Sequence, residues 1–278
     1  MRAVRTLIAD LTPLELRGKV TLVPVVNEPA LHRGQRCGDD ALDLARSCPG
    51  RPDGTITEQI AHALTRLIRS ADHYIDLHSG GTSMRVLPLV GYMLHPDAAV
   101  LDMQRRMARA FNLPILWGTD ARLEGRSLSA ARDAGVPAIY AEYLGGDADD
   151  LAGVRALVEG CLNVMGELRM IARDPAPRAV EHAIEDPRPN SGHMQVCYPS
   201  PIAGFFEPAA RLGDHIRAGT LVGTVADALG EQVQAIYSRQ SGLVLVLHTC
   251  ANVSAGESLA VILELDPALV APLPSNVR

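Results

Sequence analysis

Lysine is nearly absent from this sequence: Lys19 is the only one among 278 residues, so arginine carries almost all of the positive charge. Schiff-base catalysis and a phosphate-binding P-loop each need a lysine in a defined setting, and so does a biotinyl or lipoyl carrier domain. The segment Arg17-Gly18-Lys19 resembles none of these settings. The near absence of lysine therefore argues against all of these chemistries.

Paired cysteines and long apolar runs are also missing. The five cysteines are scattered, with no Cys-x-x-Cys, so neither a thiolate zinc site nor a disulfide framework is indicated. No apolar run is long enough to span a membrane, and the N-terminus lacks the pattern of a signal peptide. The net charge of −6 gives no reason to expect nucleic acid or a membrane as a partner. We expect a cytoplasmic protein, and the sequence permits a homo-oligomer without specifying one.

Hydrophobic periodicity predicts alternating helices and strands in the first part of the chain. We expect helices over residues 4–16, 55–70, 100–111, 127–134 and 149–170, and strands over residues 20–26, 74–78, 85–93 and 136–141. Thr57 is the expected N-cap of the second helix, and residues 27–54 are expected to form a long ordered loop. The first helix has neither an N-cap nor a strand before it, so the sequence reads as if an opening strand were missing.

Two of the predicted strands end in an ionisable side chain followed by glycines. His78 closes the strand over residues 74–78, and Glu142 follows the strand over residues 136–141. Ligands and catalytic groups gather at the carboxyl ends of strands in α/β sheets. Imidazole is the commonest metal ligand, although a histidine that simply caps a strand end fits the first segment equally well. Asp76 is a candidate to orient His78 from behind.

The composition changes near residue 175. Four prolines lie among charges between residues 173 and 190, which predicts a domain boundary. Beyond it the pattern becomes all-β and contains an internal repeat. The segments 204–206 and 219–225 are echoed by 242–244 and 256–262. We therefore expect an α/β domain over residues 1–174, a linker over 175–190 and a small β-rich domain over 191–278.

Four segments together resemble the succinylglutamate desuccinylase/aspartoacylase family of zinc-dependent deacylases. They are Val23–Ala30, Asp43–Gly50, Ile75–Gly81 and Ala141–Gly146, in the family's order. Each segment is weak by itself, but the four in order are specific, and the match covers nearly the whole chain. The resemblance implies a zinc-carboxypeptidase-like fold, in which helices flank a mixed sheet, followed by a small C-terminal all-β domain.

The resemblance also implies roles for particular residues. In the family a His-x-x-Glu motif supplies two zinc ligands, a later histidine supplies the third, and a glutamate acts on the zinc-bound water. By this resemblance His78 would be the third ligand and Glu142 the general base. Arg46, together with Arg36, would bind the carboxylate of an N-acyl amino acid or a related small molecule. One Zn²⁺ per subunit is implied if the missing ligands are supplied, and it would lower the pKa of its bound water toward ~7.

Two departures from the family pattern leave two hypotheses open. The only His-x-x-Glu in the chain is His182–Glu185, which follows Glu142 instead of preceding the first helix. Ala45 stands where the family has asparagine, and it cannot make the amide's hydrogen bonds. Either the chain begins downstream of its true start, or the site has degenerated. The protein is then a zinc-dependent deacylase or amidohydrolase, or it is a catalytically inactive member that acts as a small-molecule binding or interaction protein.

Overall fold

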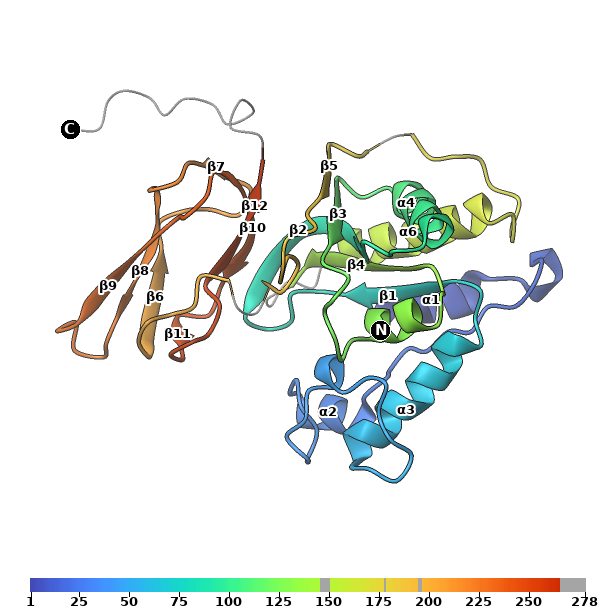
Figure 1. Cartoon of the computed structure of the whole chain (residues 1–278), viewed down its shortest axis with the longest axis horizontal. Coiled ribbons are helices and arrows are strands. Elements are labelled where there is room, and N and C mark those ends of the chain that lie inside the picture. The colour runs from blue at the N-terminus through green and yellow to red at the C-terminus, as the bar shows by residue number, and fades with distance from the viewer. Residues whose placement is uncertain (146–150, 178, 195–196, 266–278) are drawn as a thin grey trace. The chain divides into compact units, whose positions relative to one another are not determined.

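The computed structural model describes residues 1–145, 151–177, 179–194 and 197–265 (Figure 1). The chain divides into two compact units, which we treat separately. Unit 1 is Met1–His78, Pro88–Ala141 and Asp149–Gly192, and unit 2 is Ser79–Leu87, Glu142–Ala148 and His193–Arg278. The domain limits at residues 174 and 190 stay a prediction.

Unit 1 has the predicted α/β architecture. Its helices are α1 (Arg2–Asp10), η1 (Pro13–Glu15), α2 (Glu28–Arg33), η2 (Leu44–Arg46), α3 (Ile56–Arg69), α4 (Ala98–Phe111), α5 (Ser127–Asp133) and α6 (Leu151–Glu167). Its strands are β1 (Tyr74–His78), β3 (Ile115–Thr119), β5 (His182–Glu185), the later part of β2 (Met84–Met93) and most of β4 (Ala138–Leu144). The strand order is β1-β4-β2-β3-β5. Strand β3 pairs in parallel with both β2 and β5.

Helices α4 and α6 pack against each other through a glycine and an ion pair between the two helices. Helices α4 and α6 lie side by side (Figure 1), and Arg106 on α4 is ion-paired with Glu167 on α6 at 2.7 Å. Gly160 permits the close approach, because a Cβ there would lie only 2.3 Å from the Phe111 ring. Both helices therefore depend on a contact that a larger residue would break.

The N-terminal cap of α3 differs from the prediction. Thr55, not Thr57, is the N-cap, and Glu58 accepts a hydrogen bond from the Thr55 N–H at 2.8 Å. Thr57 is buried instead, and both its N–H and its hydroxyl donate to the carboxylate of Asp40, at 2.9 and 2.8 Å. Thr57 was the wrong choice because a carboxylate seventeen residues away takes both of its donors.

Two other predicted elements are also wrong. The helix expected over residues 4–16 ends at Asp10, and a short 3-10 turn, η1, follows it. Pro13 explains the break, since proline cannot continue an α-helix from the preceding turn. The strand expected over residues 20–26 does not form. Pro24 lacks a backbone donor, and Val23 and Val26 are each 37% exposed, so this apolar run is not a buried strand.

Strands β3 and β5 were not foreseen. Strand β5 lies in the proline-rich segment, and its Glu185 accepts hydrogen bonds from Arg105 at 2.7 Å and from the Tyr92 hydroxyl at 2.8 Å. Strand β3 is buried along its whole length. These tertiary contacts, which no local pattern encodes, hold the two strands in the sheet.

Unit 2 is the predicted all-β part of the chain. Its strands are β6 (Gly204–Pro208), β7 (His215–Ile216), β8 (Leu221–Ala226), β9 (Val233–Tyr237), β10 (Gly242–His248), β11 (Asn252–Val253) and β12 (Ala260–Glu264). One antiparallel sheet has the order β11-β6-β8-β9. Strand β10 pairs antiparallel with β12, with β7 and with the beginning of β2. Buried side chains from both groups of strands share one core.

The internal repeat seen in the sequence corresponds to a repeat in the structure of unit 2. Strand β6 pairs antiparallel with β8, as β10 does with β12. The halves also exchange short strands, because β7 pairs with β10 and β11 pairs with β6. Gly219 and Gly256 precede β8 and β12 with φ angles of +85° and +84°, which non-glycine residues seldom adopt. Each half therefore completes the sheet of the other.

Candidate functional site

His78 lies at the end of β1, as predicted, and contacts Asp76 two residues earlier. Its Nε2 is 3.1 Å from Oδ2 of Asp76. The same carboxylate oxygen accepts a hydrogen bond of 2.6 Å from the Ser127 hydroxyl, at the start of α5. Side chains at i and i+2 of a strand point to the same side, which is why the Asp-x-His spacing brings these two groups together. Asp76 and Ser127 thus fix the position of the His78 ring.

The Asp76 carboxylate is held in its ionised form. Burial would raise the pKa of Asp76, but the charge of His78 and hydrogen bonds from His78, Ser127 and Tyr74 outweigh burial and lower the pKa to about 2. Burial raises the pKa of Tyr74, and the negative charge of Asp76 raises it further. The Tyr74 hydroxyl therefore stays protonated and remains a donor to the carboxylate.

Arg36 and Arg46 lie close together, beside a third arginine that the sequence analysis missed. Burial lowers the pKa of Arg126, and the positive charges of Arg46 and Arg36 lower it further. Asp43 is within 3.0 Å of both Nε and Nη2 of Arg36. Its other oxygen accepts a hydrogen bond from the backbone N–H of Ala45, which shapes η2. The result is an arginine cluster (Arg36, Arg46 and Arg126) with more positive than negative charge.

The chain segments that carry Arg46 and Arg126 are in direct backbone contact. Gly125 has φ +78°, and a Cβ there would lie 2.6 Å from the carbonyl oxygen of Arg46. The Gly125 carbonyl accepts a hydrogen bond of 2.9 Å from the N–H of Cys48. Gly125 therefore permits the close approach of the two segments. In the sequence, a glycine followed by Arg126 and Ser127 was the feature that could have drawn attention to these two residues. Ser127 and Arg126 come from this one turn.

Glu142 is buried, with 7% of its surface exposed. It lies on β4 immediately after the boundary between the units, so it belongs to unit 2. The two glycine-bearing turns that follow the predicted strands meet within unit 2. The Gly80 N–H donates to the Leu144 carbonyl at 2.7 Å, and a Cβ on Gly145 would lie 2.6 Å from the Gly80 nitrogen. Glycine is thus required in both turns.

A zinc ion does not fit the donors that the structure describes. Among residues 1–145, 151–177, 179–194 and 197–265, no three His, Cys, Asp or Glu side chains come together in a way that could hold a metal. His182 and Glu185 form the only His-x-x-Glu, but Glu185 is bound to Arg105 and Tyr92. Within the described part of the chain, Glu185 thus takes part in hydrogen bonds that join β5 to β2 and α4.

Comparisons with known proteins agree with the geometry of unit 1. Residues 1–163 match the succinylglutamate desuccinylase/aspartoacylase catalytic domain. The chain is 28% identical to an N-alpha-acetyl-L-2,4-diaminobutyric acid deacetylase from Halomonas elongata, over 96% of this chain and 78% of that protein.

Two solved structures are similar over 94% of this chain and 79% of their own. One is the product-bound ectoine utilization protein EutE (DoeB) from Ruegeria pomeroyi, with a TM-score of 0.84 and 27% identity. The other is a succinylglutamate desuccinylase from a Silicibacter species, with a TM-score of 0.85 and 26% identity. In the described part of the chain no helix is long and apolar enough to cross a membrane. Since the family match covers more than half of the sequence, the chain belongs to the succinylglutamate desuccinylase/aspartoacylase family of deacylases.

Proposed function

We propose that this protein is an amidohydrolase that removes an acyl group from an N-acyl amino acid or a related small molecule. One observation carries the proposal: the similarity to an N-alpha-acetyl-L-2,4-diaminobutyric acid deacetylase extends over 96% of the chain. The substrate class follows from that protein's name, and the arginine cluster supports it. We also propose that the protein is cytoplasmic, which cell fractionation would test.

The arginine cluster suits the carboxylate end of such a substrate. Guanidinium groups bind carboxylates through paired, charge-assisted hydrogen bonds. Arg36 is paired with Asp43 and Arg46 donates to the Ala45 carbonyl at 2.7 Å, but each guanidinium carries five N–H donors, so the cluster can still bind a carboxylate. The electrostatic repulsion among the three arginines would fall when an anion binds. Ala45 has no side-chain amide, which asparagine would supply at this position. The arginines must therefore hold the carboxylate without such a group.

Glu142 is our candidate for the general base. A carboxylate at this position would accept a proton from the attacking water and later return it to the leaving amine. Burial suits this role, because proton transfers are controlled best where bulk water is excluded. Zinc dependence, with one Zn²⁺ per subunit and His78 as one ligand, is part of the proposal. The described donors alone do not form a complete site for the metal.

A second candidate function has its own supporting observation. No set of three metal donors is found in the described part of the chain, and Ala45 replaces the family's asparagine. A protein of this fold without the metal would keep the arginine cluster and would bind small carboxylates without hydrolysing them. This candidate predicts stabilisation by an N-acyl amino acid and no release of its amine.

The experiment compares wild type with Glu142→Gln, using Glu231→Gln as a matched control at an exposed position. Release of 2,4-diaminobutyrate from its N-acetyl derivative is measured with added Zn²⁺, together with zinc content. We expect turnover by wild type and by Glu231→Gln, and a loss of about 100-fold or more in Glu142→Gln at an unchanged melting temperature. Equal turnover by all three would remove Glu142 from the mechanism. Thermal stabilisation without turnover would establish the binding protein instead.

A further inference from the structure

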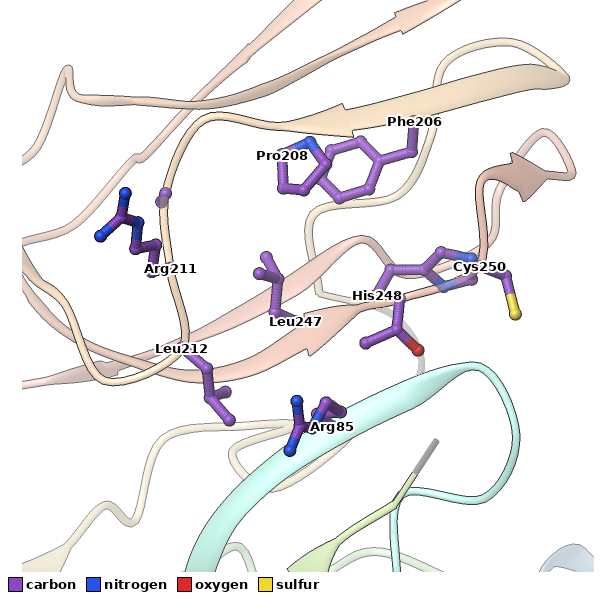
Figure 2. Close-up of a pocket in the computed structure, with 10 residues that line it drawn as sticks. Arg85, Phe206, Pro208, Arg211, Leu212, Leu247, His248 and Cys250 are labelled. Carbon is purple, nitrogen blue, oxygen red and sulfur yellow. The ribbon is translucent and has the colours of Figure 1, made fainter. Parts of the chain in front are cut away.

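Unit 2 contains a pocket of about 380 Å³ that the proposed deacylase chemistry does not use. Its lining residues are Arg85, Phe206, Pro208, Ala210, Arg211, Leu212, Leu247, His248, Thr249 and Cys250. Figure 2 shows Phe206 and Pro208 on one side of this space, Arg85 on the opposite side, and Leu247 and His248 between them. A volume of this order is enough for a small organic ligand.

His248 is the unusual member of the lining. It is 1% exposed, and neither ring nitrogen has a hydrogen-bond partner among the described residues. Its backbone is satisfied, because its N–H donates to the Leu259 carbonyl at 2.9 Å. The ring makes an edge contact with Phe206, at 6.3 Å between centroids, which cannot satisfy both nitrogens. Buried polar groups normally have partners, and this ring has none within the described part of the chain.

The charge of the lining indicates the sign of that ligand. Two guanidinium groups, on Arg85 and Arg211, belong to the lining, and none of the ten lining residues is acidic. No ion pair or side-chain hydrogen bond joins either guanidinium to a described residue; Asp214 accepts only from the backbone N–H of Arg211, at 2.7 Å. Both arginines are exposed, and Figure 2 shows them at two different edges of the pocket. An anionic group of a ligand could therefore bind to the guanidinium groups of Arg85 and Arg211.

The remaining walls indicate an apolar body for the ligand. Phe206 and Pro208 are two residues apart on β6 and face the same side, and Leu247 pairs directly with Arg85 across β10 and β2. Leu212 completes the apolar surface. A free inorganic anion would leave these walls uncovered.

We propose that this pocket is a binding site for a small organic carboxylate. Its carboxylate lies between Arg85 and Arg211, its apolar body lies against Phe206, Pro208 and Leu247, and the imidazole of His248 hydrogen-bonds to the ligand or to a water that it holds. In either protonation state the ring has at least one N–H donor. The site does not depend on hydrolysis, so it holds whether the protein is a deacylase or not.

The test uses butyrate as the probe, with butyramide and inorganic phosphate as comparisons at matched ionic strength. Binding is followed through the NMR signal of the His248 ring Cε1–H in the wild-type chain, which separates this pocket from the arginine cluster of unit 1. We expect a saturable shift with butyrate at an affinity about tenfold or more above that for butyramide, because charge-assisted hydrogen bonds are lost with the amide. Phosphate should bind more weakly than butyrate.

Matched arginine variants complete the test. Arg85→Gln/Arg211→Gln should weaken butyrate binding at least tenfold, measured through the same His248 signal. Arg217→Gln removes an exposed arginine of unit 2 that does not line the pocket, and should leave the affinity unchanged. Melting temperatures confirm that all variants fold. No shift of the His248 ring, equal binding of butyramide, tighter binding of phosphate, or an equal loss in Arg217→Gln would each overturn the proposal.

Discussion

Asp76 in unit 1 is a largely buried ionisable side chain, 20% exposed, and His248 in unit 2 is 1% exposed; the two differ in their partners. Asp76 receives hydrogen bonds from His78, Ser127 and Tyr74. His248 receives none at either ring nitrogen from the described residues. A buried polar group with all its partners stabilises the fold, whereas one without partners costs free energy until something binds it. The contrast separates a group that completes the structure from one that awaits a ligand.

The arginines repeat this contrast. Arg36 and Arg105 in unit 1 are paired with Asp43 and Glu185, at 3.0 and 2.6 Å. Arg85 and Arg211 line the pocket of unit 2, and no carboxylate among the described residues pairs with either. In a paired arginine, several N–H donors already bind a carboxylate of the protein and are not available to a ligand. Mutations at the partnered and unpartnered groups should therefore differ in their effects on stability, and the following substitutions test this from the largest effect to the smallest.

Asp76→Ala should cost the most, about 3 kcal/mol in the free energy of unfolding. The reason is that the substitution removes one acceptor and leaves the Tyr74 and Ser127 hydroxyls without their shared partner. Urea denaturation of the unliganded protein measures the change. Asp76→Asn keeps one acceptor oxygen and should cost less. A loss below about 1 kcal/mol for Asp76→Ala would show that the carboxylate is not the partnered group that we describe.

The same carboxylate predicts a dependence of stability on pH. The pKa of Asp76 falls from about 3.9 in the unfolded chain to about 2 in the folded protein. A group whose pKa is lower in the folded state stabilises that state above its unfolded pKa, and the contribution is lost as the pH falls through the folded value. Stability of wild type minus that of Asp76→Asn should therefore be constant above about pH 5 and shrink between about pH 4 and 2.

Glu185→Gln should cost about 1.5 kcal/mol, because the ion pair is partly exposed to solvent and therefore screened. Glu185 accepts from Arg105 and Tyr92, and the loss of its charge weakens the ion pair while the neutral amide keeps one acceptor. Urea denaturation again gives the value, with Glu181→Gln, just before β5, as the control. If the control were equally destabilised, the effect would come from β5 in general and not from the partnered carboxylate.

Ser127→Ala should cost about 1 kcal/mol, since it removes one of the donors to Asp76. The double variant with Asp76→Ala sharpens the comparison, because two residues in one hydrogen-bond network are not additive. We expect the Ser127 substitution to cost little once Asp76 is absent. Full additivity in the denaturation midpoints would contradict the network.

Local patterns predicted those parts of the structure that local physics decides. The strand that ends at His78, the helix over residues 55–70 and the internal repeat of unit 2 all follow from periodicity and turn residues. The position of Asp76 beside His78 also followed from strand alternation. The family match and the fold class were therefore accessible from the sequence.

What was missed depends on partners far away in the sequence. Strand β5 forms because Glu185 meets Arg105 and Tyr92, and Thr57 is lost as a cap because Asp40 binds it. Arg126 and Ser127 can be recognised as site residues only in the folded structure, where Gly125 brings their turn against η2. No special role was predicted for His248, since the lack of a hydrogen-bond partner is visible only in the folded structure.

His248→Phe should have the smallest effect, a change of less than about 1 kcal/mol or even a gain in stability. Replacing Asp76 breaks hydrogen bonds, but replacing His248 breaks none that its side chain makes with the described residues. Phenylalanine keeps a planar ring against Phe206 and removes two polar atoms that lack partners, which is favourable in a buried site. The open pocket beside the ring gives room for the larger side chain.

Leu245→Ala, in the same strand and fully buried, provides the scale, since a large-to-small change there should cost about 2–5 kcal/mol. A loss in His248→Phe close to that of Leu245→Ala would mean that the imidazole is already satisfied in the free protein. The contrast with Asp76, and with it the case for a ligand, would then fail.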